Sequence, residues 1–144
     1  MGTSSIQNQP LATPSRILAA SGLVGTLFAS ATVWYFDPSK SNFFPVCPLF
    51  SLTGFACPGC GLTRGFHALF HGDLYTAVDF NALTPLFALI FAFLVASLVS
   101  VAVRGKGLVR LSASPVYLFG FLILLLTFGV LRNLPYSPFT FLYP

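Results

Sequence analysis

Charged side chains are scarce in this chain of 144 residues. They make up 7% of it, against about 25% in soluble domains, whereas 56% of the residues are hydrophobic and 16% are aromatic. Such a composition is typical of a protein that lies in lipid. The length allows one domain, which leaves no room for a soluble catalytic domain beside a membrane part. The net charge of +4 is spread thinly, so the clustered basic face of a nucleic-acid-binding protein is absent.

Common catalytic motifs are missing as well. The sequence has no P-loop, no glycine-rich dinucleotide fingerprint and no Ser/His/Asp order. Its acidic residues, Asp37, Asp73 and Asp79, are not spaced for acid/base catalysis. Residues 1–15 lack the charged region, apolar region and cleavage site of a signal peptide, so we expect the first apolar stretch to be retained as a helix. Any activity is expected in or at the bilayer.

Three apolar runs predict transmembrane helices at residues 17–36, 83–103 and 116–131. The first two carry no charge and, at about 1.5 Å per residue, match a hydrocarbon core of about 30 Å. The third is slightly short. We therefore expect an all-α integral membrane protein forming a single domain over residues 1–144. The remaining segments are a polar tail at 1–16, a loop at 37–82, a basic turn at 104–115 and a C-terminal tail at 132–144.

Basic residues predict the orientation of this chain. The N-terminal tail and the basic turn share one side of the membrane and carry Arg16, Arg104, Lys106 and Arg110, while the other side carries Lys40, Arg64 and Arg132. Because cytoplasmic segments carry the excess of Lys and Arg, we expect the N-terminus in the cytoplasm and the loop facing outward.

The loop at residues 37–82 is too long for a turn and too apolar for a solvated connection. Its Phe- and Pro-rich part, residues 42–55, is expected to lie at the membrane interface or to re-enter shallowly. One short helix is predicted from Leu62 to His71, and a second from Leu74 to Phe80 with Asp73 as its cap.

Three cysteines fall within this loop: Cys47, Cys57 and Cys60. Cys57 and Cys60 form a CPGC turn at the start of the first short helix, where free N–H groups and the helix dipole lower the pKa of a thiol. A redox disulfide is one interpretation, although the βαβ pattern of thioredoxin is absent. A static disulfide from Cys57 to Cys60 or to Cys47, favoured if the loop faces outward, is a second. Packing as small apolar residues around a tight turn is a third.

Two histidines offer a metal-binding alternative. His67 and His71 are spaced i, i+4 and, with Cys57 and Cys60, form the pattern C-x2-C-x6-H-x3-H. The gap between its halves is shorter than the roughly 12 residues of a zinc finger, so we predict no cofactor and keep Zn or another transition metal as the alternative. Arg64 joins both histidines in a polar stripe, which would face lipid headgroups or a buried ligand.

The sequence around the cysteines resembles a bacterial membrane protein family, domain of unknown function 2752. The shared features are Cys47-Pro48, Thr53-Gly54, the run Cys57-Pro58-Gly59-Cys60-Gly61-Leu62-Thr63-Arg64, Gly72-Asp73 and, after the last apolar run, Arg132-Asn133-Leu134-Pro135. The resemblance implies a small multispanning protein of the bacterial cytoplasmic (inner) membrane without an assigned activity. It also implies a fold-defining set of Cys47, Cys57, Cys60, Thr63, Arg64 and Asp73. Both histidines lie outside the shared motif, which weakens the metal alternative.

Two functions of different classes remain open. The first is a non-enzymatic accessory subunit that packs against other transmembrane proteins of a larger complex. Small residues in the first span would let partner helices approach closely: Ala19, Ala20, Gly22, Gly25, Ala29, Ser30 and Ala31. The second is a membrane thiol-redox or metal-binding protein that uses Cys57 and Cys60. The expected partners are the lipid bilayer and other transmembrane proteins, with no nucleic acid.

Overall fold

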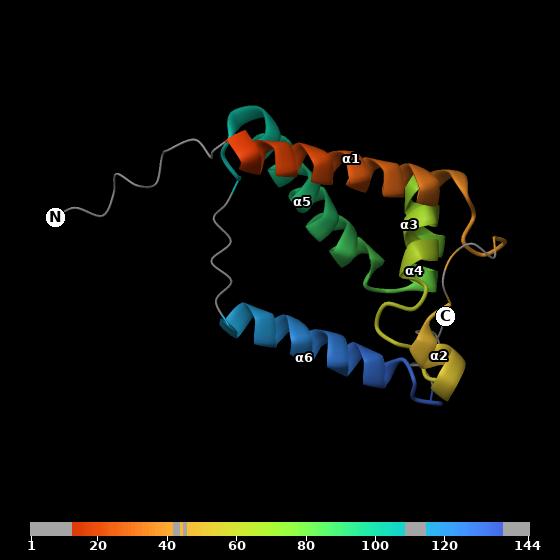
Figure 1. The fold of residues 1–144 in the computed structure, drawn as a ribbon. Coiled ribbons are helices and arrows are strands. Elements are labelled where there is room, and N and C mark those ends of the chain that lie inside the picture. The colour runs from red at the N-terminus through yellow and green to blue at the C-terminus, as the bar shows by residue number, and fades with distance from the viewer. Residues whose placement is uncertain (1–12, 42–43, 45, 109–114, 137–144) are drawn as a thin grey trace. The chain divides into compact units, whose positions relative to one another are not determined.

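The computed structural model describes residues 13–41, 44, 46–108 and 115–136, so most of both predicted tails and half of the predicted basic turn lie outside the described residues. Every secondary-structure element of the described part is a helix (Figure 1). The helices are α1 (Thr13–Tyr35), α2 (Pro48–Thr53), α3 (Leu62–Phe70), α4 (Leu74–Phe80), α5 (Thr84–Arg104) and α6 (Pro115–Leu131). The all-α class is therefore confirmed for these residues.

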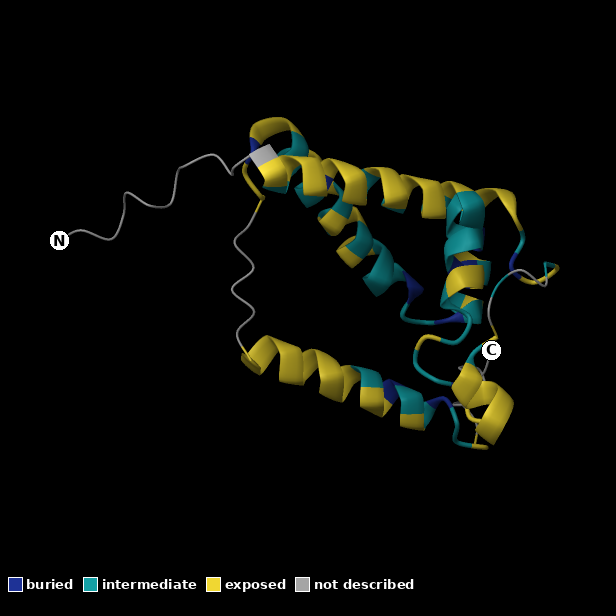
Figure 2. Cartoon of the chain, in the orientation of Figure 1, coloured by how far each residue is buried: buried dark blue, intermediate teal, exposed yellow. Residues whose placement is uncertain are grey.

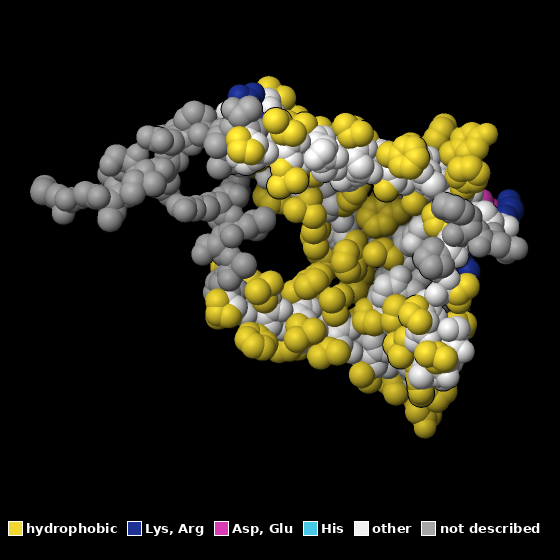
Figure 3. Space-filling view, in the orientation of Figure 1, with side chains coloured by type: hydrophobic (Ala, Val, Ile, Leu, Met, Phe, Trp, Pro, Cys, Tyr) yellow, Lys and Arg dark blue, Asp and Glu magenta, His cyan; other side chains and the backbone are white. Residues whose placement is uncertain are grey.

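Within the described residues, two helices are long and apolar enough to cross a membrane, Pro14–Tyr35 of α1 and Thr84–Arg104 of α5. Very little of either is buried in the protein, and the side chains they expose are largely hydrophobic (Figures 2 and 3). This exposure distinguishes them from the core helices of a soluble protein and is compatible with a membrane protein. Helix α6 has 17 residues and is shorter than the other two, so a third span stays a prediction.

The chain divides into two compact units. The first comprises the described residues of Met1–Ser30 and Leu89–Leu111. There the guanidinium of Arg16 donates hydrogen bonds to the carbonyl of Ala102, at 3.2 and 3.3 Å, and to that of Val103, at 2.9 Å. These carbonyls belong to the last turn of α5, where no intrahelical N–H reaches them and a cation is favoured by the helix dipole.

The second unit comprises the described residues of Ala31–Ala88 and Ser112–Pro144 and contains all three cysteines. Its helix α2 lies within the Phe- and Pro-rich residues 42–55, for which the sequence predicted no helix. Pro48 starts this helix, where its missing N–H costs nothing. Gly54, with φ of 74°, ends it and donates its N–H to the carbonyl of Phe50 at 2.9 Å. Six residues are too few to show a helical period in the sequence.

The two short helices expected after the CPGC turn are present as α3 and α4, and they pack against each other. Asp73 caps α4 by accepting hydrogen bonds from the N–H of Thr76, at 3.0 Å, and from its hydroxyl, at 2.6 Å. Gly65 allows the close approach of α3, because a Cβ atom there would lie 3.0 Å from the carbonyl of Ala77 and would collide with the hydroxyl of Thr84.

Candidate thiol site

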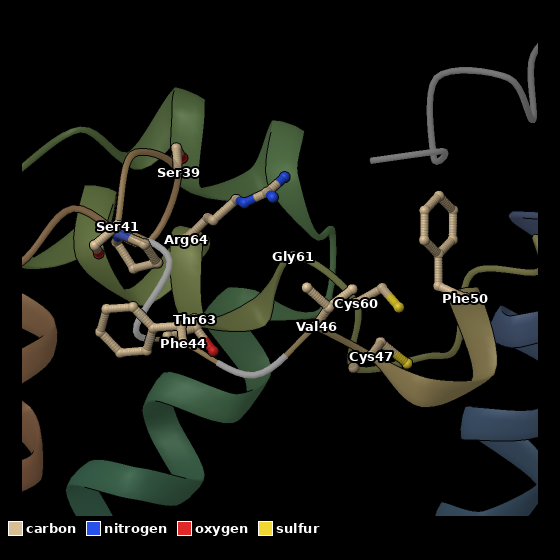
Figure 4. Close-up of a pocket in the computed structure, with 12 residues that line it drawn as sticks. Ser39, Ser41, Phe44, Val46, Cys47, Phe50, Cys60, Gly61, Thr63 and Arg64 are labelled. Atoms are coloured by element: carbon tan, nitrogen blue, oxygen red, sulfur yellow. The ribbon is translucent and has the colours of Figure 1, made fainter. Parts of the chain in front are cut away.

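The three cysteines meet in the second unit. The Sγ atom of Cys57 lies 3.2 Å from that of Cys60 and 3.4 Å from that of Cys47, and all three sulfurs lie within 4.8 Å of one another. The three thiols are free and half-buried. Cys47 immediately precedes α2, and its sulfur and that of Cys60 point the same way in Figure 4. Two short segments, each leading into a helix, thus converge on one cluster.

The CPGC turn is closed by its own backbone. The N–H of Cys60 donates to the carbonyl of Cys57 at 3.0 Å, and the N–H of Leu62 donates to that of Gly59 at 3.0 Å. The N–H of Cys57 also points at Sγ of Cys60, at 3.2 Å. Gly61 follows with φ of 82°, a conformation that favours glycine, and leads the chain into α3.

Asn81, at the end of α4, holds this turn from one side. Its side chain is 1% exposed and its Nδ2 donates to the carbonyls of Pro58, at 2.8 Å, and Cys60, at 3.0 Å. Its Oδ1 accepts from the N–H of Leu83 at 2.9 Å. All the hydrogen bonds of this buried amide are therefore used to fix the turn to the start of α5. Asn81 was not among the predicted site residues, and its signal in the sequence is an amide between two apolar segments.

The residues after α6 hold the turn from the other side. The buried guanidinium of Arg132 donates through Nη1 to the carbonyls of Cys57, at 2.9 Å, and Cys60, at 3.1 Å. Asn133 pairs with both backbone groups of Ala56, accepting from its N–H and donating to its carbonyl at 2.8 Å each. It also donates to the carbonyl of Gly129 at 2.7 Å. The Arg132-Asn133 pair is thus a backbone clamp for the cysteine turn.

The surroundings make two of the thiols chemically unlike. The N–H of Phe50 in α2, followed by the neighbouring Cys57 thiol, lowers the pKa of Cys47 to about 7. Burial, followed by the Cys57 thiol, raises the pKa of Cys60 to about 12. Near neutral pH, Cys47 is therefore about half thiolate while Cys60 stays protonated. Cys57 contacts both residues. Its thiol therefore lies next to the nucleophilic thiolate of Cys47 and next to the protonated thiol of Cys60.

Cavities flank the cluster within this unit. One of about 520 Å³ is lined by Cys47 and Cys60 together with Ser39, Ser41, Thr63 and Arg64 (Figure 4). Another of about 510 Å³ is lined by Cys57 and mainly apolar residues, including Phe55, Leu126 and Val130. Of the motif residues predicted from the resemblance, Thr63 and Arg64 therefore line the same cavity as the thiols of Cys47 and Cys60. Gly72, with φ of 82°, and Asp73 instead shape the connection from α3 to α4.

The histidines are not brought to the cysteine cluster. Nδ1 of His67 lies 2.7 Å from the carbonyl of Val33, and Nδ1 of His71 lies 2.8 Å from the carbonyl of His67. The ring of His71 also stacks on Trp34 with centroids 5.9 Å apart. Among the described residues, the group that could ligate a metal consists of Cys47, Cys57 and Cys60. Cys47, rather than His67 and His71, therefore joins Cys57 and Cys60 in the group that could bind a metal ion.

Searches of curated proteins and of solved structures return no match to this chain. A family model does match, over residues 47–95, which include the three cysteines, α2, α3, α4 and the first part of α5. The Arg132-Asn133 clamp lies beyond the matched residues. The family is described as "Protein of unknown function (DUF2752)", and this match confirms the resemblance for residues 47–95.

Proposed function

We propose that this protein is a membrane-bound thiol protein that carries electrons by reversible disulfide formation among Cys47, Cys57 and Cys60. The observation that carries the proposal is the position of Cys57 Sγ, 3.4 Å from one sulfur and 3.2 Å from another of very different acidity. A thiolate is the attacking species in disulfide exchange, which makes Cys47 the nucleophile. Cys57 then resolves the mixed disulfide, and the protonated Cys60 is the second thiol with which Cys57 can pair.

The clamp supports this chemistry because it holds the backbone while the sulfurs change partners. Asn81, Arg132 and Asn133 together donate to the carbonyls of residues 56, 57, 58 and 60. Preorganised sites of this kind keep reacting groups in contact without relying on loop motion. These hydrogen bonds therefore fix the backbone of Cys57 and Cys60, so that their side chains can rotate to pair with another sulfur while the turn stays in place.

Redox titration of the full chain in a neutral detergent tests the proposal. After equilibration at graded ratios of reduced to oxidised dithiothreitol, alkylation and peptide mass spectrometry should show a reversible two-electron disulfide between Cys47 and Cys57, with Cys60 reduced. Cys60→Ser should keep this disulfide, whereas Cys57→Ser should reduce disulfide formation at least tenfold. Three thiols that stay reduced at every ratio, or a disulfide that no ratio reduces, would contradict the proposal.

Binding of a soft metal ion is a second candidate function, favoured by the grouping of three sulfurs within 4.8 Å. Thiolate ligands select Cu(I) or Zn, and Zn retains an open fourth position when three protein ligands are present. Metal analysis of the purified protein separates the two candidates. Stoichiometric Cu or Zn that is lost in Cys47→Ser and kept in a His67→Ala, His71→Ala variant would support metal binding through the cysteines alone.

The membrane setting is a further part of the proposal. We place three spans in a bacterial cytoplasmic membrane, with the N-terminus inside and the cysteine loop outside, on the support of the apolar α1 and α5 and the distribution of basic residues. The exposed hydrophobic side chains of α1 also support packing against other transmembrane proteins as an accessory subunit. Stoichiometric co-purification with a larger membrane complex tests this role, and a protein that always purifies alone would contradict it.

A further inference from the structure

The cavity of about 520 Å³ beside Cys47 contains polar groups that thiol exchange within the cluster does not use. In Figure 4 the sulfurs of Cys47 and Cys60 lie toward one end, and Ser39, Ser41 and Arg64 lie toward the other. Its volume falls within the roughly 300–1,000 Å³ of small-molecule sites. The cavity therefore has room for a compound that reaches from the guanidinium of Arg64 to the thiol of Cys47.

Arg64 is the cation of this cavity. Among the described residues that line it, no other carries a positive charge, and the thiolate of Cys47 lies toward the opposite end. Two of the three acidic side chains are already engaged, since Asp37 pairs with Lys40 at 3.2 Å and Asp73 accepts from Thr76. The third, Asp79, does not line the cavity. No ion pair within the described part of the chain neutralises Arg64. The exposed guanidinium is thus available to a ligand, and its planar fork matches carboxylate and phosphate groups.

We infer that this cavity binds an anionic low-molecular-weight disulfide, with a carboxylate on Arg64 and the disulfide sulfurs beside Cys47. The inference rests on the proposed function and names its substrate class. The hydroxyls of Ser39 and Ser41, toward the Arg64 end, and that of Thr63 line the same cavity and offer hydrogen bonds to the polar groups of such a compound.

The exchange balances in two steps. The Cys47 thiolate attacks one sulfur of the compound RS–SR, which forms a Cys47–SR bond, breaks the S–S bond and releases RS⁻ to take a proton from water. The Cys57 thiol then gives its proton to solvent and attacks Sγ of Cys47, which forms the Cys47–Cys57 disulfide and releases the second RS⁻. The protein loses two electrons, and the compound gains them as two RSH molecules.

Rates of oxidation by three disulfides of different charge test the inference. The reduced full chain in neutral detergent is mixed with glutathione disulfide, which is anionic, 2-hydroxyethyl disulfide, which is neutral, or cystamine, which is cationic. Formation of the Cys47–Cys57 disulfide is followed by quench and mass spectrometry. We expect the anionic compound to react about tenfold faster than the cationic one, which is the size of effect that one attractive charge gives.

Arg64→Gln should abolish this preference, and Arg64→Lys should keep part of it. Lys40→Gln is the matched control, because Lys40 is an exposed cation already paired with Asp37, and it should leave the preference unchanged. Oxidation by all three compounds with a rate ratio that Arg64→Gln does not alter would overturn the inference alone. Failure of all three to oxidise the protein would contradict the proposed function itself.

The phosphate of a lipid headgroup is another anion that could bind Arg64. Added phosphatidylglycerol distinguishes a disulfide site from a headgroup site. If its phosphate competes for Arg64, glutathione disulfide should lose its faster reaction. We expect the preference to persist at equimolar phosphatidylglycerol. Its complete loss there would overturn the inference in favour of a headgroup site.

Discussion

At the scale of single residues, the different acidities of Cys47 and Cys60 arise from their surroundings. Cys47 lies at the start of α2, where the N–H of Phe50 lowers its pKa to about 7, whereas burial raises the pKa of Cys60 to about 12. A depressed pKa means that the folded protein favours the Cys47 thiolate, so this thiolate stabilises the fold more as the pH rises from about 7 toward the ordinary value of 9.0. A raised pKa means that the fold favours the protonated form of Cys60.

This difference predicts how the two thiols respond to pH. Alkylation of Cys47 by iodoacetamide should rise about fivefold between pH 6 and pH 7 and about twofold more above it, because the rate follows the thiolate fraction. Cys60 should react at least about a hundredfold more slowly at pH 7. Peptide mass spectrometry of the reduced protein measures both rates. Equal reactivity of the two cysteines at pH 7 would contradict the assignment of Cys47 as the nucleophile.

Asn133 provides a second test at this scale. Asn133→Ala removes the acceptor for the N–H of Ala56 and the donor to its carbonyl, both at 2.8 Å. Each buried group left without a partner costs about 1–3 kcal/mol, so the turn should open more often. We expect alkylation of Cys60 to accelerate at least about tenfold, the equivalent of about 1.4 kcal/mol.

Asn133→Asp is the matched variant, because it keeps an acceptor for the N–H of Ala56 and loses the donor to the carbonyl. It should give an intermediate rate. Wild-type protection of Cys60 in Asn133→Ala would show that the clamp does not hold the turn.

At the scale of elements, α3 reaches its neighbours through a glycine. A Cβ atom at position 65 would lie 3.0 Å from the carbonyl of Ala77 and would collide with the side chain of the buried Thr84. Gly129 plays the same part for α6, since a Cβ atom there would lie 3.1 Å from the ring of Pro58. Close contacts at glycines thus join α3 to α4 and the start of α5, and join α6 to Pro58 of the cysteine turn.

Gly65→Ala should therefore destabilise the second unit by about 1–3 kcal/mol, the usual cost of overpacking. Gly25→Ala in α1 is the control, because no atom lies within 4 Å of its added Cβ and alanine favours a helix. The urea concentration at which Cys60 loses half of its protection from alkylation measures the stability of both variants. An unchanged urea midpoint in Gly65→Ala would show that α3 and α5 can separate at no cost.

At the scale of the whole molecule, α6 decides how many times the chain crosses the membrane. Its 17 residues span about 25 Å, against a hydrocarbon core of about 30 Å. The buried Arg132 that follows it would be costly near lipid, but its Nη1 is satisfied by two carbonyls of the cysteine turn. The short helix α6 can therefore end next to Arg132, because this cation is surrounded by protein rather than by lipid.

We therefore predict that α6 spans the membrane. Single cysteines placed at Gly107 and Tyr136, in a Cys47→Ser, Cys57→Ser, Cys60→Ser background, should react with a membrane-impermeant maleimide from opposite sides. Intact cells should label position 136, and position 107 should be labelled only after the membrane is opened. Labelling of both from the same side would leave α1 and α5 as the spans.

Much of the fold could be predicted from the sequence because its signals are local. Uninterrupted apolar runs marked α1, α5 and α6, and Gly72 and Asp73 marked the break between α3 and α4. The CPGC turn and its third cysteine were also visible, and the motif led to the family that matches residues 47–95. Composition, turn residues and capping residues act on their immediate neighbours, so they can be read without knowing the fold.

The tertiary structure alone decided how the site is assembled. It turned His67 toward a backbone carbonyl and placed Asn81, Arg132 and Asn133 on the carbonyls of the turn. The bonds of Asn133 to Ala56 join positions 77 residues apart. Hydrogen bonds from single side chains to distant backbone groups leave no period or spacing in a sequence, because their partners are set by where the helices end in space rather than along the chain.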